Sequence, residues 1–412
     1  MVNLASKLAI AGVVSVGVLY QFLIKYLVFD VLGVGRETFS IESYGHLKCE
    51  KVEELGIEGC EDMWMHEKTG HLYMACSDSR SREQWLPAVD HLNATGRGLV
   101  DRIAVLDTRG SGRLASRIKW LSIENFSGIK GDGTLNLHGL DIRADDNTDV
   151  LRILLVNHRP PIDPITGEFL DAAKHGANST VEQFQTEIGT ETMRHVRTYH
   201  HDLIQTPNRV AWVSDHSFVF TNDHTHKHGF RRGLEAILGG GNVGYCDRRS
   251  CHIAYDSEFW GPNGLVRGKD GLIYVPNVIG SNVQVFALTE THHLRKLHTL
   301  KTLPIDNLSV DQNGDIFGAA FPQVYKWIQS SSDAFGVHPP SAVVKISRAG
   351  KVHGRAVDVD RTVDDYTVEK IFEDDSGVLP GSTIVVHDVK TGSYFFGGVM
   401  SPFITICERL SR

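Results

Sequence analysis

The sequence predicts an all-β protein, a six-bladed β-propeller with a central Ca²⁺ site, preceded by an N-terminal hydrophobic helix. The main reason for this prediction is a hairpin pattern that recurs six times along the chain. The composition agrees, because 40 Gly, 13 Pro and 41% hydrophobic residues are typical of a globular, turn-rich chain. A propeller of this size counts as one domain, so we assign residues 1–36 to a leader with its linker and residues 37–412 to the propeller.

Each repeat starts with a small polar or acidic residue, continues through two apolar strands, and turns between them at Gly, Asp or Asn. This is the pattern of a β-hairpin. The six units begin at Glu61, His138, Asn208, Asn263, Asp306 and Gly381. Their uneven spacing averages near the length of a four-stranded blade with loops. A β-sandwich would account for the strands, but not for units that open on the same kind of residue.

The N-terminal segment is apolar and almost uncharged from Leu8 to Ile24, with Lys7 before the run and Lys25 after it. Extended to Phe29, the run is about long enough to cross a bilayer at a rise of about 1.5 Å per residue. No small-residue cleavage site stands out. We therefore expect an uncleaved signal anchor, with a cleaved signal peptide as the alternative.

The six cysteines are even in number and lie outside the apolar segment, as expected of a chain that folds in an oxidising compartment. None has the C-x-x-C spacing of a zinc site. Three sequons agree with the secretory pathway, and they begin at Asn93, Asn125 and Asn178. We expect a propeller that is lumenal or extracellular, either anchored to a membrane or secreted.

Two classes of function are disfavoured by the sequence. The net charge of −8 comes without a Lys/Arg cluster, so a nucleic-acid partner is not expected. No G-x-S-x-G elbow is present, which argues against a serine hydrolase and covalent catalysis.

Residues that open successive inner strands of a propeller converge on its axis. Here they are hard oxygen donors, two carboxylates and three amides: Glu61, Asn208, Asn263, Asp306 and Asn307. Five such donors with water or substrate suit Ca²⁺, and no His or Cys set suits zinc. One such residue alone is more often a turn former, but five at one topological position favour a metal site. Asn307 also begins a formal sequon, yet a residue on the axis could not carry a glycan.

Ordered motifs give the chain a resemblance to the serum paraoxonase and arylesterase family over nearly its whole length after residue 45. The matching stretches are C-x-x-x-E before GCED at 59–62, NLHGL at 136–140, LLVNH at 154–158, PN at 207–208, TNDH at 221–224, PNG at 262–264, DNLSVD at 306–311 and ITICE at 404–408. The resemblance implies that the five oxygen donors hold a catalytic calcium. It also implies that His138 and His158 form the dyad that activates water.

The resemblance also implies a disulfide between Cys49 and Cys407, which would tie the first strand to the last blade. Two further pairs are predicted from local sequence. The turn at 68–69 places Cys60 almost opposite Cys76, and Cys246 lies close to Cys251 along the chain.

The chain departs from the family at residues 209, 320 and 321. Arg209 stands where the family has an aspartate ligand of a second, structural calcium. Asp62 and the Leu140 carbonyl remain as candidate ligands, but we expect this ion to be absent and Arg209 to pair with Asp62. Ala320 and Phe321 replace a cysteine and a histidine, which makes the pocket wall more apolar.

We expect His138 to act as the general base, with His158 orienting it or relaying its proton. Glu61 or Asp306 is the rival base. Asp223 and His224 are candidate pocket residues.

The histidines at 224, 226 and 228 fit a solvated turn better than a metal site. The segment 229–238 places an apolar face on a helix, formed by Phe230, Leu234, Ile237 and Leu238. In the family such a helix roofs the active site and contacts lipid; ordinary packing is the alternative.

The sequence leads to a Ca²⁺-dependent hydrolase of small apolar lactones or esters, acting near a membrane. Two alternatives keep the propeller and change its role. One is a strictosidine synthase-like enzyme with a non-hydrolytic step in metabolite biosynthesis, and the other is a non-enzymatic, calcium-stabilised binding protein. Specificity resides in variable loops, so the sequence does not name the substrate.

Overall fold

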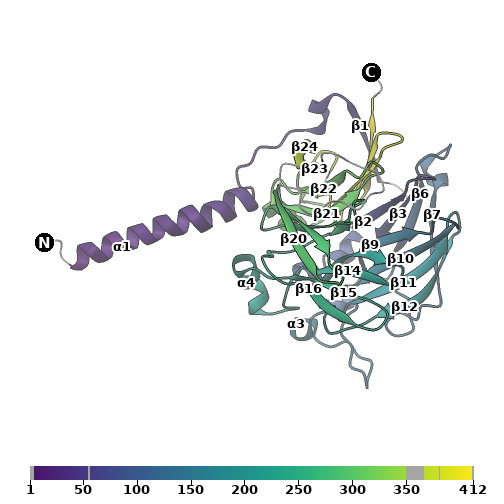
Figure 1. Ribbon diagram of the computed structural model, residues 1–412, viewed down its shortest axis with the longest axis horizontal. Helices are drawn as coiled ribbons and strands as arrows, with labels where there is room; N and C mark the ends of the chain where they lie inside the picture. Colours follow the sequence, from purple (N-terminus) through teal and green to yellow (C-terminus); the bar gives the residue numbers. More distant parts are fainter. Residues whose placement is uncertain (1–3, 54–55, 349–365, 380, 411–412) are drawn as a thin grey trace.

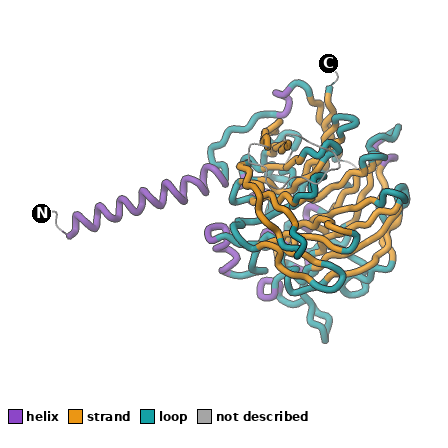
Figure 2. The backbone as a smooth tube through the Cα atoms, viewed as in Figure 1, coloured by secondary structure: helices purple, strands orange, loops and turns teal. Residues whose placement is uncertain are grey.

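The computed structural model describes residues 4–53, 56–348, 366–379 and 381–410. Within these residues six sheets of four or five strands surround a central axis, with one long helix projecting from them (Figures 1 and 2). The innermost strands are β2 (Asp62–His66), β9 (Leu137–Ala144), β13 (Pro207–Ser214), β17 (Val266–Arg267), β21 (Ile305–Val310) and β25 (Ile384–Asp388). Each contacts the next and β25 contacts β2, so the ring closes. The predicted six-bladed propeller is confirmed.

The outer strands of the first five blades follow their inner strand in chain order, antiparallel to one another. They are β3 (His71–Cys76), β6 (Arg102–Asp107) and β7 (Ile118–Trp120) in blade 1; β10 (Val150–Asn157), β11 (Thr180–Glu187) and β12 (Thr192–Tyr199) in blade 2; β14 (Ser217–Asn222), β15 (Asn242–Cys246) and β16 (Cys251–Tyr255) in blade 3; β18 (Ile273–Asn277), β19 (Asn282–Leu288) and β20 (Leu294–Lys301) in blade 4; and β22 (Ile316–Ala320), β23 (Ser341–Arg348) and β24 (Tyr366–Asp374) in blade 5. Blade 2 has a fifth, parallel strand, β8 (Ser122–Glu124).

Blade 6 is built from both ends of the chain. Its strands β25, β26 (Ser393–Gly397) and β27 (Ile404–Arg409) come from the C-terminal end, and β1 (Leu47–Val52) pairs with β27 from the N-terminal end. Cys49 lies opposite Cys407 in this pairing, and the two form a disulfide. The pairs Cys60–Cys76 and Cys246–Cys251 are also present. All six cysteines are therefore paired as expected.

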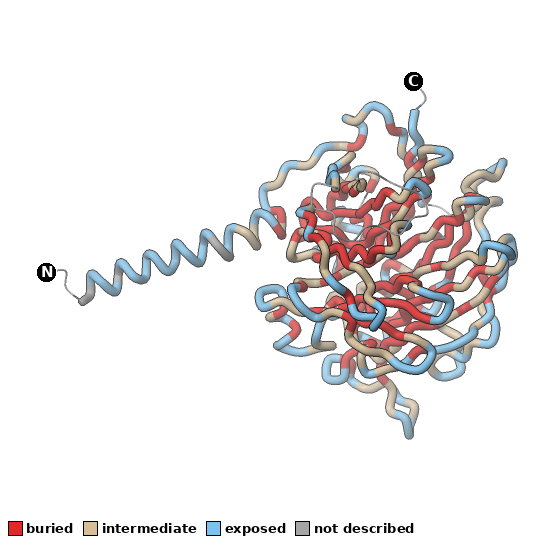
Figure 3. Tube along the Cα trace, in the orientation of Figure 1, coloured by how far each residue is buried: buried red, intermediate tan, exposed pale blue. Residues whose placement is uncertain are grey.

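Buried residues concentrate in the strands of the ring (Figure 3), and the hydrophobic core is divided among the interfaces between neighbouring blades. Met63 and Leu72 of blade 1 share a cluster with Ile384 of blade 6, whereas Tyr73 of blade 1 shares another with Leu155 of blade 2. A blade packed on both sides needs apolar residues on both faces of its strands. This requirement explains the nearly continuous apolar runs in the repeats.

Short strands and helices lie in the connections between the ring strands. The connection between β3 and β6 contains α2 (Ser79–Arg82), β4 (Trp85–Leu86), η4 (Pro87–Val89), β5 (His91–Leu92) and η5 (Ala94–Gly96). The other helices of the ring are η3 (Ile41–Tyr44), η6 (Leu114–Arg117), α3 (Ala172–His175), α4 (Phe230–Leu238) and α5 (Val324–Ser330).

The projecting helix α1 (Leu4–Leu19) continues into the π-helical segments η1 (Tyr20–Ile24) and η2 (Tyr26–Val31). Many apolar side chains of α1 are exposed, among them Val13 and Val16. Within the described residues, no helix has both the length and the apolar character needed to cross a membrane. The Tyr26 hydroxyl donates to the carbonyl of Ile279 (2.9 Å) and joins the end of this helical segment to the ring.

The domain division at 36/37 stays a prediction; residues 1–3 and 411–412 at the outer ends of the two predicted domains lie outside the described residues.

The sequon asparagines differ in exposure. Asn93 and Asn125 are exposed and Asn178 is half-buried, so glycosylation at all three stays a prediction. Asn307, which we excluded as a glycan site, is fully buried.

Loss of the long-range disulfide should lower stability more than loss of the local one. Cys49 and Cys407 close a loop with a sequence separation of 358, against 5 for Cys246 and Cys251. The free energy of unfolding should fall by roughly 2–5 kcal/mol in Cys49→Ala/Cys407→Ala and by less in Cys246→Ala/Cys251→Ala. Urea unfolding of both variants checks this, and a larger loss in the second would contradict it.

Candidate active site

The five predicted oxygen donors meet at one end of the central channel. Glu61 directly precedes β2, Asn208 is the second residue of β13, Asn263 lies shortly before β17, and Asp306 and Asn307 are early in β21. Asn307 Nδ2 donates to Glu61 Oε1 (2.8 Å). Asn263 Oδ1 accepts from the backbone NH of Gly264, which bridges to Asn307. The side chains converge because their strands start at the same face of the ring.

Two glycines allow the inner strands to approach this closely. A Cβ at Gly264 would lie 1.7 Å from Asn307 Oδ1, and one at Gly139 would lie 2.4 Å from the Asn208 carbonyl oxygen. Neither space admits a side chain, so the glycines of the PNG and NLHGL motifs are required by packing at the axis.

The donor set fits a divalent cation. Burial raises the pKa of Glu61, and burial followed by the nearby charge of Glu61 raises that of Asp306 well above its usual value. The Oδ1 atoms of Asn208 and Asn307 are buried with no hydrogen-bond partner in the described structure. Two repelling carboxylates and two unpartnered amide oxygens are the chemistry that Ca²⁺ satisfies. No group of three or more His, Cys, Asp or Glu side chains among the described residues is arranged for a metal, so the amides would have to complete the set.

The two predicted histidines lie beside these donors. The rings of His138, in β9, and His158, directly after β10, have centroids 4.9 Å apart. His138 Nε2 lies 3.2 Å from Asn208 Nδ2 and 3.6 Å from Glu61 Oε1. His158 Nδ1 lies 3.0 Å from Ser179 Oγ. His138 therefore contacts the oxygen donors directly, whereas His158 contacts His138 and Ser179.

Both histidines are held neutral. Burial, followed by the nearby His158 ring and the charge of Arg82, keeps the pKa of His138 well below its usual value. Burial, followed by the charges of Arg82 and Arg232, lowers the pKa of His158 to about 3. A neutral imidazole can accept a proton, which a general base must do.

Arg209 pairs with Asp62, as the sequence suggested. Arg209 Nε lies 2.7 Å from Asp62 Oδ2, and both side chains are almost fully buried. The guanidinium also donates to the carbonyls of Leu140 (3.4 Å) and Leu308. Burial raises the pKa of Asp62 to about 6, although the charge of Arg209 acts in the opposite direction. A cation already engages Asp62 and the Leu140 carbonyl, so these residues do not fit a second calcium.

Arg82, Asp101 and Thr383 are site neighbours that sequence reasoning missed. Thr383 Oγ1 donates to Glu61 Oε2 (2.7 Å) from the position directly before β25. The sequence could have indicated Thr383, because this residue directly precedes the sixth inner strand, as Glu61 precedes the first. Arg82 and Asp101 are buried beside the histidines. They come from the β3–β6 connection, where no repeat pattern marks them.

The segment from Asp223 to α4 only partly matches its predicted role. Asp223 is buried and its charge acts on Asp306, so it lies near the donors. His224 and His226 point their Nδ1 atoms at Glu235 of α4, at 3.0 and 2.7 Å. His224 is thus held by the helix, and pocket lining by this residue stays unsupported.

Helix α4 begins one residue after the start of the predicted segment 229–238, and most of its predicted apolar face points outward. Phe230 is 82% exposed and Leu238 is 72% exposed, whereas Arg232 and Glu235 are buried. The alternative in which the apolar face packs as ordinary core is wrong. The reason is that Glu235 binds two histidines and Arg232 binds the β4–β5 segment.

The β4–β5 segment covers the two histidines. Trp85 Nε1 donates to the His158 carbonyl (2.8 Å). Arg232 donates to the carbonyls of Pro87 (2.7 Å) and Ala88 (2.8 Å) and pairs with Asp90. A cavity of only about 10 Å³ remains between α2, Trp85 and His158.

The more apolar pocket wall expected at residues 320 and 321 stays a prediction. Ala320 and Phe321 are both buried, and the Phe321 ring packs 5.0 Å from that of Trp327 in α5.

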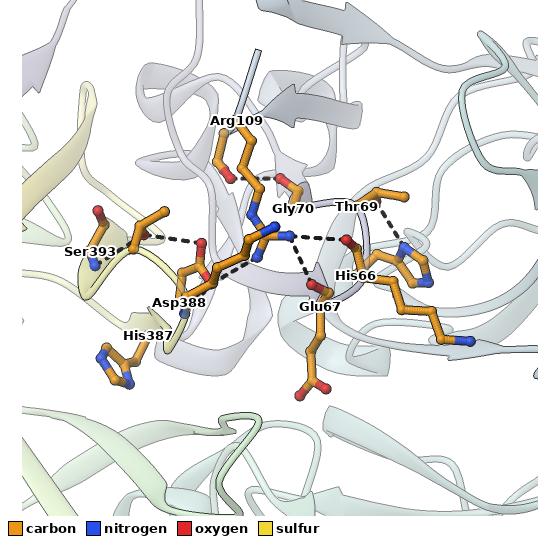
Figure 4. A network of polar contacts seen from close by, with 12 residues as sticks. His66, Glu67, Thr69, Gly70, Arg109, His387, Asp388 and Ser393 are labelled. Carbon is orange, nitrogen blue, oxygen red and sulfur yellow. Dashed lines mark hydrogen bonds and ion pairs between the residues drawn. The ribbon is translucent and has the colours of Figure 1, made fainter.

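The other end of the channel opens into a cavity of about 580 Å³, with Arg209 in its wall. The Arg209–Asp62 pair lies between this cavity and the oxygen donors. Lys269 of blade 4 pairs across the mouth with Glu67 of blade 1 (2.8 Å). Beside it, Arg109 joins the β2–β3 turn to Asp388 of blade 6 (Figure 4).

The geometry agrees with a comparison of the sequence with known families. The profile of the Arylesterase family matches residues 126–401. The chain belongs to the arylesterase family. This arylesterase-family chain is 28% identical over 269 residues to serum paraoxonase/arylesterase 2 of Gallus gallus and 27% identical over 267 residues to that of Homo sapiens. These matches span 63% and 62% of this chain and 65% of each relative.

Solved structures match over most of the arylesterase-family chain, at low similarity. A luciferin-regenerating enzyme has a TM-score of 0.47 at 10% identity, covering 89% of this chain and 96% of its own. A gluconolactonase from Xanthomonas campestris has a TM-score of 0.44 at 13% identity, covering 86% and 88%. The fold assignment rests on the strands of this chain instead.

Removal of the Arg209 guanidinium should strongly destabilise the protein. In Arg209→Met the Asp62 carboxylate stays buried without its counter-charge, which costs about 3–5 kcal/mol of unfolding free energy. Chemical denaturation measures this loss. Asp62→Leu/Arg209→Met is the control and should regain much of the stability, because no buried charge is left. A loss below about 1 kcal/mol in Arg209→Met would contradict the importance of the pair.

Acidification should destabilise the fold through His158. The folded protein keeps this side chain neutral down to a pKa of about 3, whereas the unfolded chain protonates it near its ordinary pKa of about 6.5. The stability is therefore complete above about pH 6.5 and is lost as the pH falls below it. Urea unfolding at several pH values should show a shallower acid loss in His158→Gln than in the unmodified protein. Equal pH dependence in both would refute the assignment.

Proposed function

We propose that this protein is a Ca²⁺-dependent hydrolase that opens lactones or cleaves aryl and alkyl esters. One observation carries the proposal: two buried carboxylates and two unpartnered amide oxygens meet within reach of a neutral histidine. Family membership supports the same chemistry, because the relatives are named paraoxonases and arylesterases.

The proposed ligands of the ion are Glu61, Asn208, Asn263, Asp306 and Asn307. Bound calcium would polarise a carbonyl oxygen and stabilise the negative charge that develops on it. Thr383 and Asn307 donate to opposite oxygens of Glu61 and hold its carboxylate in place. The cavity of about 10 Å³ at His158 is too small for a lactone or ester, so the β4–β5 segment would have to move to admit substrate.

His138 is the proposed general base. Its Nε2 faces Glu61 and Asn208, and this is the atom that would take a proton from water. His158 would receive the proton from His138, supported by the 4.9 Å between their rings and by Ser179 at its Nδ1. Glu61 and Asp306 remain the rival bases, because burial raises their pKa values and so makes the two carboxylates more basic.

We also propose that the protein folds in the secretory pathway and acts near a membrane. Three disulfides support an oxidising compartment. The exposed apolar side chains of α1 and α4 support contact with lipid through both segments. An apolar lactone or ester would concentrate at the same surface.

A hydrolysis panel tests the function directly. The domain from about residue 37 onward, offered γ- and δ-lactones and phenyl acetate, should hydrolyse at least one of them and lose the activity with EGTA. Asn263→Ala should also abolish it, because one oxygen donor is missing. His138→Gln should lower kcat by about 10²–10⁴-fold if this residue is the base. Hydrolysis that persists in EGTA would contradict the calcium mechanism.

A folded, calcium-loaded protein that hydrolyses none of the panel would refute the hydrolase. The strictosidine synthase-like step or a non-enzymatic binding role would then take its place.

A further inference from the structure

The strand that carries His138 is irregular where the histidine lies. β9 pairs with β10 through Leu140 opposite Leu155 and Leu137 opposite Asn157, with a register shift between these pairs. His138 and Gly139 thus face a single residue of β10, Val156. A bulge of this kind re-aims side chains, but it also interrupts the backbone ladder that would hold them.

Two side chains from blade 1 bind the backbone at the start of this bulge. Asp101 Oδ2 accepts a hydrogen bond from the NH of Leu137 (2.8 Å), and Arg82 Nη2 donates to the Leu137 carbonyl (2.5 Å). The peptide groups on both sides of Leu137 are therefore held, and the second of them belongs to His138. Ser77 Oγ donates to the other oxygen of Asp101 (2.7 Å) and fixes its orientation.

Burial makes this arrangement rigid. Arg82 is 4% exposed and Asp101 is 7% exposed, so neither can exchange its bond to Leu137 for one to bulk water. Arg82 also lines the small cavity next to His158. The same guanidinium thus borders one histidine and binds the peptide of the other.

We propose that Arg82 and Asp101 are positioning residues that clamp Leu137 and hold the His138 imidazole against Asn208 and Glu61. The clamp replaces the strand pairing that the bulge removes. Its consequence for catalysis rests on the proposed hydrolase function, whereas the clamp itself is a property of the backbone.

The kinetic test compares Arg82→Met with a matched arginine at the far end of the same blade. Arg109 follows β6, donates to the carbonyls of Glu67 and Lys68 (both 3.0 Å), and pairs with Asp388 (2.9 Å; Figure 4). Arg82→Met should lower kcat of the full-length protein by about 10–100-fold with little change in KM, because the base is misplaced. Arg82→Lys should recover part of this loss, and Arg109→Met should leave kcat unchanged.

A double variant separates positioning from general destabilisation. If Arg82 acts through His138, Arg82→Met should lower kcat no further in a His138→Gln background. Fully additive losses would overturn the proposal.

Hydrogen exchange of the backbone amides tests the clamp without any substrate. The Leu137 amide should exchange at least about tenfold faster in Arg82→Met and Asp101→Ala than in Arg109→Met, while inner-strand amides of blades 3–5 exchange as in the unmodified protein. Unchanged exchange at Leu137 overturns the clamp. If no lactone or ester is hydrolysed, the function fails, and the exchange experiment still decides on the clamp.

Discussion

The structure depends on buried negative charge at the axis of the ring. Glu61, Asp62 and Asp306 lie together in the interior, and burial raises the pKa of each. Such a group of carboxylates cannot remain ionised without compensation. The chain provides one cation itself, Arg209, which pairs with Asp62. Glu61 and Asp306 remain for the cation that we propose as the cofactor.

This division explains why the channel has two different ends. Arg209 of blade 3 binds carbonyls from blades 2 and 5 as well as Asp62 of blade 1, and thereby joins its own blade to three others at the centre. On one side of it lie the oxygen donors and the histidines, covered by the β4–β5 segment and α4. On the other side lies an open cavity spanned by the pair of Glu67 and Lys269. The chemistry that we propose belongs to the covered end, where burial keeps both histidines neutral.

Most of the donor set could be predicted because a propeller repeats. Glu61, Asn208, Asn263, Asp306 and Asn307 all open a hairpin unit, and position in the repeat translates directly into position on the axis. Thr383 could have been found in the same way. Arg82 and Asp101 could not, because they belong to an irregular connection that reaches the site only after blade 1 has packed against blade 2. The apolar face of segment 229–238 was predicted, but its outward direction depends on the distant partners of Arg232 and Glu235.

The sequence by itself determined the six blades, the cysteine pairs, the family and the chemical nature of the oxygen donors. The blades and the oxygen donors follow from local patterns: strand alternation, hairpin turns and the residue that opens each repeat. The family and the Cys49–Cys407 pair follow from the resemblance that the ordered motifs carry. Only the tertiary structure decided how His138 is oriented, what covers His158, and which end of the channel Arg209 closes off. Each of these depends on contacts between residues far apart in the sequence, because burial and charge pairing exist only after the blades have closed into a ring.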